Sequence, residues 1–159
     1  MPLTGPPLIA VATGIVGSAW ASGAIASATF MGVTAIAEEP TNAARNWQAI
    51  YKRGASIMPK VAGAVAVLYG YAAYDVRSNS GPWGPYAGAA ASVLAIVPWT
   101  LVVMNYTNAC LAKMAQGKEE TKGWNLGELL RRWNILNMAR SCFPLIASIL
   151  ALTNLINHN

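Results

Sequence analysis

Two long stretches of this chain contain no Asp, Glu, Lys or Arg: one runs from Met1 to Ala37 and the other from Ser78 to Ala112. Each is longer than the roughly 20 apolar residues with which an α-helix crosses the hydrocarbon core of a bilayer. Charged residues make up 11% of the chain, whereas an ordinary soluble domain contains about 25%. We therefore expect an integral membrane protein.

Two shorter apolar stretches complete the pattern. Residues 61–74 lie between Lys60 and Asp75, and residues 141–157 follow Arg140. Charged side chains at such positions can extend toward lipid headgroups, so each stretch reaches spanning length with its flanking turns. We predict an all-α fold, an integral membrane four-helix bundle formed by a single membrane domain. Its spans are expected at about 7–36, 56–75, 84–111 and 138–157 of a domain covering 1–159. Because Lys60 falls inside the second window, a three-span arrangement remains an alternative.

The basic residues indicate an orientation. Ten of the eleven lie in the connection between spans one and two or between spans three and four, and Arg77 alone lies between spans two and three. The positive-inside rule then places both long loops in the cytosol and both termini outside or in a lumen, an endoplasmic reticulum lumen if the source is fungal. Basic residues that flank spans in this way do not predict nucleic-acid binding. The ten are Arg45, Lys52, Arg53, Lys60, Lys113, Lys118, Lys122, Arg131, Arg132 and Arg140.

Local signals predict how the helices begin and bend. Pro40 and Thr41 are typical of a helix start, so the cytosolic loop between spans one and two should be partly helical. Asn125 and Glu128 have the spacing of a capping box, from which a helix can continue directly into span four. Pro98 should kink span three.

Small residues recur at every fourth position in the spans, as at Gly14, Ser18 and Ser22. Such stripes let helix backbones approach closely. Close packing matters in a bilayer because lipid is as apolar as the side chains and supplies no hydrophobic driving force for helix association. They would serve packing within one chain or an interface between copies in a homo-oligomer.

Polar and aromatic residues gather toward the predicted cytosolic end. Trp133, Asn137 and Arg140 form one stripe on the helix that enters span four. Span three offers Thr100, Met104 and Asn108 on one face, with Asn105 beside it, and the first loop offers Trp47, Tyr51 and Arg53. Each of these residues also has a simpler alternative role that requires no shared site. Aromatic rings near helix ends often anchor at the membrane interface, arginines extend to lipid phosphates, and Asn108 could bond Asn137 between helices.

Metal-binding residues are scarce. His158 is the only histidine, so a haem, zinc or non-haem iron site built on imidazoles is not expected within one chain. Cys110 and Cys142 would lie near the reducing cytosol, where we expect free thiols.

These residues resemble the anthrone oxygenases, a family of small fungal and bacterial membrane proteins. The resemblance rests on Pro98-Trp99-Thr100 with Met104 and Thr107-Asn108-Ala109-Cys110-Leu111, and on Trp133-Asn134-Ile135-Leu136-Asn137-Met138-Ala139-Arg140. The spacing of Trp47, Tyr51, Gly54 and Pro59 adds to it, and the four-span plan covers nearly the whole chain.

The resemblance implies oxidation of an aromatic polyketide anthrone to an anthraquinone, with dioxygen as co-substrate and without a metal or flavin cofactor. Asn108, Asn137 and Arg140 would then be catalytic, stabilising the negative charge of the anthrone enolate. The substrate-binding residues would be Trp47, Tyr51, Arg53, Thr100, Met104, Asn105 and Trp133. Tyr51, or a water beside Arg53, is the candidate for the general base.

Two alternatives remain at this point. The same pocket would suit cyclisation or another rearrangement of a hydrophobic polyketide, which consumes no oxygen. A non-enzymatic tetraspan scaffold or transporter subunit is the other, although no charge lies deep within a predicted span, as a transport path would require.

Overall fold

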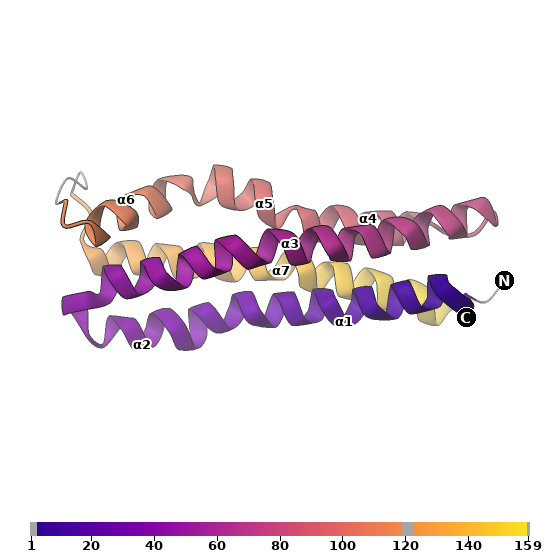
Figure 1. Ribbon diagram of the computed structural model, residues 1–159, viewed down its shortest axis with the longest axis horizontal. Coiled ribbons are helices and arrows are strands. Elements are labelled where there is room, and N and C mark those ends of the chain that lie inside the picture. Colours follow the sequence, from indigo (N-terminus) through magenta and orange to yellow (C-terminus); the bar gives the residue numbers. More distant parts are fainter. Residues whose placement is uncertain (1–2, 119–122, 159) are drawn as a thin grey trace.

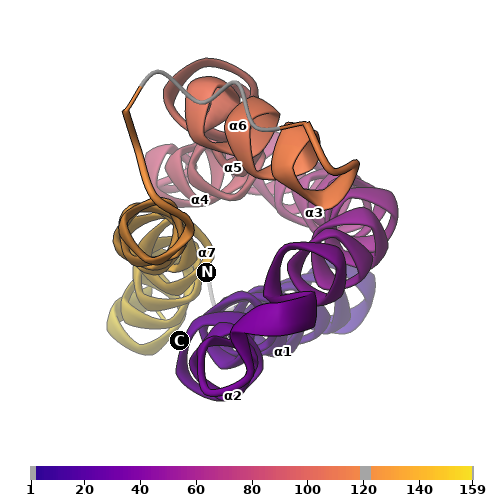
Figure 2. The same cartoon turned by 90° about the vertical axis from the view of Figure 1, so that its left-hand side faces the viewer.

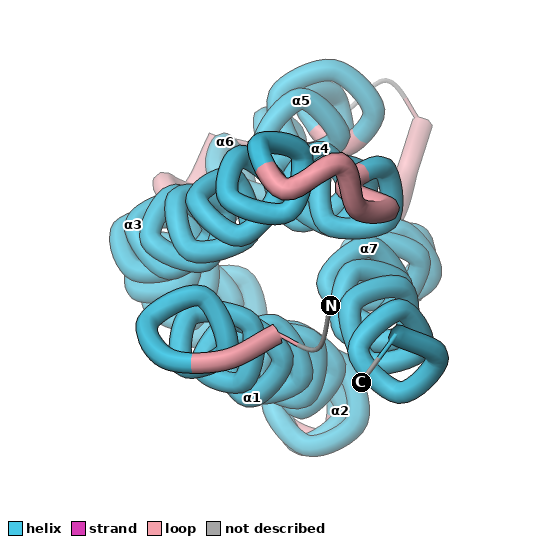
Figure 3. Tube along the Cα trace, turned by 90° about the vertical axis from the view of Figure 1, so that its right-hand side faces the viewer, coloured by secondary structure: helices cyan, strands magenta, loops and turns pink. Residues whose placement is uncertain are grey.

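The computed structural model is a long bundle built from four columns of helix (Figure 1). It describes residues 3–118 and 123–158, so Lys122 and the side chain of His158 lie outside the described residues. Seen from either end, the columns surround a common axis (Figures 2 and 3). Column one packs against columns two and four, and column three packs against the same two. The predicted all-α membrane bundle is confirmed, and each column holds a helix long and apolar enough to cross a bilayer.

The columns follow the chain in order. Column one contains α1 (Gly5–Ser27), the π-helix η1 (Ala28–Val33) and α2 (Thr34–Ala37). A short 3₁₀ turn, η2 (Pro40–Asn42), leads into column two, which is the single helix α3 (Ala43–Ser78). Column three contains α4 (Gly84–Leu94), α5 (Ile96–Pro98), the π-helix η3 (Trp99–Val103) and α6 (Asn105–Ala115). Column four is α7 (Leu126–His158). The loop between the first two spans is thus partly helical, as predicted, because α3 begins at Ala43.

The helix α7 begins at the predicted capping box. The backbone N–H of Glu128 donates to Asn125 Oδ1 at 2.8 Å, and the backbone N–H of Asn125 donates to Glu128 Oε2 at 3.0 Å. Two N–H groups that a helix start leaves unpaired are thereby satisfied. From this cap α7 continues without a break through Arg140 to the end of the last span.

Pro98 interrupts column three as expected, but the result is a π-helix and not a simple kink. The backbone N–H of Met104 bonds the carbonyl of Trp99, five residues back, at 3.2 Å. In the ribbon, α5 and α6 diverge from the line of α4 (Figure 1). The wider π turn displaces the side chains that follow Pro98 relative to a regular helix, which bears on the site described below.

The small-residue stripe on α1 packs inside the chain. A Cβ on Gly14 would lie 2.7 Å from Tyr69 Cε1, so only glycine fits there. Ser18 Oγ and the Tyr69 hydroxyl are 2.9 Å apart, and Ser22 Oγ donates to the Ser141 carbonyl at 2.8 Å. These contacts use the stripe for packing within one chain, the first of the two predicted roles.

Candidate functional site

Arg140 lies at the centre of a hydrogen-bonded network between three columns. Its Nη1 donates to Thr100 Oγ1 at 3.0 Å, and its Nη2 donates to Asn137 Oδ1 at 2.7 Å. Asn137 is one turn earlier on α7, and Thr100 belongs to η3. Two neutral oxygen acceptors, one on each terminal nitrogen, therefore fix the guanidinium.

Asn137 is in turn held by column one. Its Nδ2 donates to the Ile25 carbonyl at 2.8 Å and to Thr29 Oγ1 at 2.9 Å, and its side chain is fully buried. Thr29 lies in η1, so each of the two π-helices supplies a threonine to the network. Single π-type turns are often found at functional sites, because the extra residue redirects side chains without breaking the helix.

Among the residues that the structure describes, no acid neutralises the charge of Arg140. Within the part of the chain that the structure describes, no carboxylate pairs with it, and its Nε is buried without a hydrogen-bond partner. A cation placed among apolar helices and unpaired is energetically costly. Each terminal nitrogen of Arg140 makes one of these hydrogen bonds, so its second N–H and the positive charge remain for an anionic or electron-rich ligand.

A cavity of about 480 Å³ lies beside this network, between column one, α3 and α7. Arg140 and Trp133 contribute to its wall from α7, and Tyr51, Arg53 and Gly54 contribute from α3. Its polar content is small, so the cavity suits an apolar ligand with few polar atoms.

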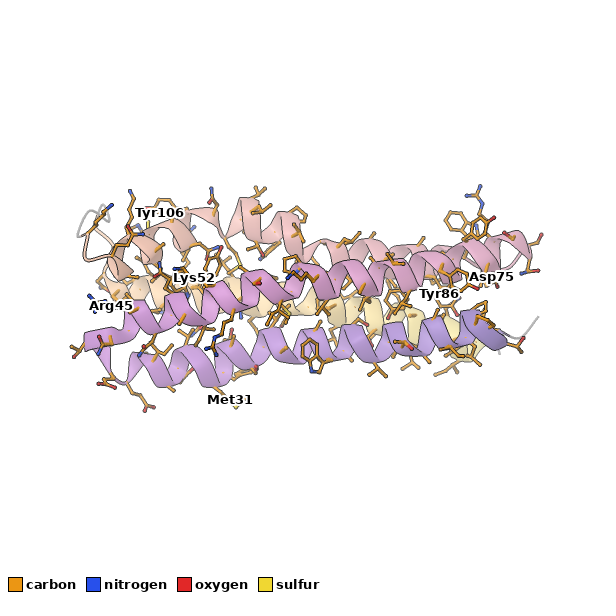
Figure 4. All side chains as sticks on the ribbon, in the orientation of Figure 1. Met31, Arg45, Lys52, Asp75, Tyr86 and Tyr106 are labelled. Carbon is orange, nitrogen blue, oxygen red and sulfur yellow. The ribbon has the colours of Figure 1, made fainter. Side chains whose placement is uncertain are left out.

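The cavity opens on the outside of the bundle. Trp20, Met31 and Ile57 line it, and they are 55%, 69% and 48% exposed. In Figure 4 the labelled Met31 points away from the helices. Trp133, by contrast, is only 1% exposed. The cavity therefore extends from the lateral surface between α1 and α3 inward to Trp133 and Arg140.

Three aromatic rings support the inner wall. The rings of Trp47 and Tyr51 stack with centroids 5.1 Å apart, and Trp47 meets Trp133 edge-on at 6.0 Å. Trp133 Nε1 donates to Asn108 Oδ1 at 3.0 Å, which fixes the tilt of the indole. Trp47 and Trp133 are both buried, so neither ring faces headgroups as an interfacial anchor would.

The structure distributes the predicted site residues over three environments. Arg140, Trp133, Tyr51 and Arg53 line the cavity, and Thr100, Asn108, Asn137 and Trp47 contact those residues without lining it. Met104 is fully buried in an apolar cluster with Trp47 and Trp133, and Asn105 is exposed away from the cavity. Asn108 and Asn137 do not bond each other: Asn108 bonds Trp133, and Asn137 bonds Ile25, Thr29 and Arg140.

Sequence reasoning missed the contribution of column one. Thr29 and the Ile25 carbonyl position Asn137, and Trp20 and Met31 line the outer part of the cavity. In the sequence, Thr29 cannot be distinguished from other hydroxyl residues of an apolar span. The Ile25 carbonyl belongs to the backbone, so no residue type predicts that it acts as an acceptor. Trp99 was predicted only as part of the family motif and not as a site residue; its Nε1 donates to the Leu136 carbonyl at 3.2 Å and ties η3 to α7.

Among the described residues, no group of three or more His, Cys, Asp or Glu side chains is close enough to hold a metal ion. Cys110 is buried and Cys142 is exposed, and both are free thiols.

Comparison with known proteins relates this arrangement to one family. The family model described as anthrone oxygenase matches residues 47–150. Anthrone oxygenase tpcL of Aspergillus fumigatus is 31% identical over 98% of this chain and 99% of its own length. Anthrone oxygenase ptaC of Pestalotiopsis fici is 35% identical over 73% of this chain and 86% of its own. Monooxygenase hypC of Dothistroma septosporum is 33% identical over 82% of this chain and 74% of its own. No solved structure matches the chain.

Proposed function

Because the chain belongs to the anthrone oxygenase family and is an oxygenase, we propose that it oxidises an anthrone-type aromatic polyketide to the anthraquinone with dioxygen, inside the membrane. The observation that carries the proposal is Arg140, a cation with no carboxylate partner among the described residues, in the wall of a mostly apolar cavity. An apolar site with one fixed positive charge fits a flat aromatic molecule that becomes an anion during reaction.

The chemistry requires a carbanion equivalent. Loss of a proton from the ring CH₂ of an anthrone gives an enolate whose charge resides on the oxygen across the ring. The enolate transfers one electron to dioxygen, and the carbon radical and superoxide combine into a peroxide on the former CH₂ carbon. After protonation, loss of one water leaves a carbonyl at that carbon. One oxygen atom thus enters the quinone and the other leaves as water, so no external reductant is consumed.

Arg140 is the catalytic residue of this scheme. Its remaining N–H donors stabilise the enolate oxygen, which lowers the free energy of the anion relative to the neutral anthrone. Asn137 has already used its amide donors on Ile25 and Thr29, so it acts as a positioning residue that orients Arg140. Asn108 likewise positions Trp133, whose ring forms the inner wall for the aromatic substrate.

Proton removal falls to Tyr51 or to a water beside Arg53. Both side chains line the cavity. No cofactor takes part in this scheme.

The proposed orientation follows from the loop charges. Arg45 and Lys52 lie toward the end of the bundle opposite to Asp75 and Tyr86 (Figure 4). We propose that the basic end is cytosolic and the termini luminal, in the endoplasmic reticulum if the source is fungal.

The test compares membranes containing the protein with membranes of the same cells without it, in air and under argon, on a panel of anthrones. We expect enzyme-dependent anthraquinone, one dioxygen consumed per anthrone, and one label from ¹⁸O₂ in each quinone. Membranes lacking the protein correct for spontaneous oxidation. Product formation without oxygen uptake would instead indicate a cyclase, and no enzyme-dependent product from any anthrone would contradict the proposal.

A further inference from the structure

The interface between column one and α3 is closed on both sides of the cavity. A Cβ on Gly17 would lie 2.9 Å from Val65 Cγ2, and a Cβ on Gly32 would lie 3.1 Å from Ile50 Cδ1. At these positions the glycine is needed because the facing helix already fills the space. The two pairs also show that the columns run antiparallel.

Between these contacts the same interface is open. The register of the flanking pairs places Gly54 opposite Ala28, and both residues line the cavity. A Cβ on Gly54 would have no atom within 4 Å. Here the missing side chain does not let the helices touch; it leaves empty space. We call this opening, between Gly54 and Ala28, the slot.

The slot lies between lipid and the charged end of the cavity. Trp20, Met31 and Ile57 are on its exposed side, and Trp133 and Arg140 are on its buried side. A ligand that comes from the bilayer therefore passes between Gly54 and Ala28 before it can reach Arg140. A fused aromatic ring system is flat, and two walls without large side chains offer it a flat passage.

We propose that Gly54 is the specificity-determining residue of the site: with Ala28 it sets how thick an aromatic substrate can be and still reach Arg140. The inference rests on the proposed anthrone oxidation, because it uses that substrate class. Flat polycyclic anthrones pass through the slot. Anthrones with groups that project from the ring plane are excluded when a substitution at Gly54 or Ala28 adds carbon atoms to either wall.

The chain contains a matched control. Gly63 lies on the same helix as Gly54, and a Cβ there also has no atom within 4 Å, but Gly63 does not line the cavity. Alanine at either position should raise thermal stability slightly, because glycine is a poor helix former. A difference between the two positions in activity therefore reports on the slot and not on the helix.

The experiment measures kcat/KM for an unsubstituted tricyclic anthrone and for the same ring carrying a tert-butyl group. For Gly54→Ala we expect a loss of about 10- to 100-fold on the tert-butyl substrate, and a loss below about threefold on the flat one. Gly54→Leu should abolish turnover of both, and Ala28→Leu, from the opposite wall, should do the same. Gly63→Ala and Gly63→Leu should stay within about twofold of the unmodified protein on both.

Anaerobic binding supplies a second readout. Trp20 lies on the exposed side of the slot and Trp133 on its buried side, so the measurement is made with Trp20→Phe introduced into each protein. Binding of an anthraquinone should then quench tryptophan fluorescence in the otherwise unmodified protein and in Gly63→Leu, and clearly less in Gly54→Leu. Where Gly54→Leu does not fold, Gly54→Ala and Ala28→Leu carry the test. Retention of normal kcat/KM ratios and normal quenching in the Gly54 variants would overturn the slot. Failure of the unmodified protein to oxidise any anthrone would contradict the proposed function, while the quenching experiment would still decide the slot.

Discussion

The two halves of the bundle use the same kinds of residue for different purposes. In the half that holds the termini, small residues bring α1, α3, α4 and α7 into contact around Tyr69, Tyr86 and a core of alanines and valines. In the other half, small residues line a cavity, and beside it lie the half-buried Arg140, the buried Asn137 and three stacked or edge-on aromatic rings. The first half stabilises the fold by close packing, and the second half holds a positive charge that no carboxylate pairs among the described residues.

The largest effect should come from the charge itself. Arg140→Ala removes the group proposed to stabilise the enolate and should lower kcat by about 100- to 1000-fold, with the protein still inserted in the membrane. Anthraquinone formation in membranes measures activity, and quantitative immunoblotting of the membrane fraction measures insertion. Turnover at the normal rate would place the site elsewhere.

A second variant keeps Arg140 but gives its positive charge a carboxylate partner. Asn137→Asp offers a carboxylate where Arg140 now meets an amide oxygen, so the guanidinium keeps its position as half of an ion pair. We expect kcat to fall by about 10- to 100-fold. Thermal stability in detergent should fall in both Asn137→Asp and Asn137→Ala, because neither side chain can donate to the Ile25 carbonyl. Equal activity in Asn137→Asp and the unmodified protein would show that an unpaired charge is not required.

The closely packed half should respond in stability and not in chemistry. Gly14→Val forces a side chain into Tyr69 and should destabilise the protein by about 1–3 kcal/mol. Gly23 is on the same helix with open space in front of it, so Gly23→Val is the control. Melting temperatures in detergent compare the two, and kcat at low temperature should remain near normal in both. An equal melting temperature for the two variants would mean that this half is not closely packed.

The smallest effect is expected at the start of α7. Glu128→Ala removes one bond of the capping box and should destabilise the protein by about 0.5–1 kcal/mol, with no change in kcat. Thermal unfolding and the anthrone assay measure the two quantities. A large loss of activity would show that the position of Arg140 depends on the helix start some three turns away.

Much of the fold could be predicted because lipid leaves few choices. Long uncharged stretches require helices in a bilayer, and the Asn125–Glu128 spacing required no tertiary information. The stripe of Trp133, Asn137 and Arg140 follows from helical periodicity alone, and it does place these residues side by side on α7.

The partners of those residues could not be predicted. The π-helices η1 and η3 shift Thr29 and Thr100 by a fraction of a turn relative to a regular α-helix. The residues around Ala28 contain no pattern that predicts η1. The amide of Asn137 donates to the Ile25 carbonyl and to Thr29, and the amide oxygen of Asn108 accepts from Trp133; neither set of partners could be read from the sequence. Gly54 has no side chain that suggests a function. Its position beside the cavity could be recognised only from the packing of α1 against α3.

The lateral opening beside Met31 has a kinetic consequence. An enzyme that takes its substrate from the bilayer responds to the mole fraction of substrate among lipids and not to its concentration in water. Diluting a fixed amount of anthrone with empty vesicles should therefore slow the reaction, although neither the protein nor the total substrate has changed. The apparent KM of such an enzyme is a property of the membrane as much as of the protein.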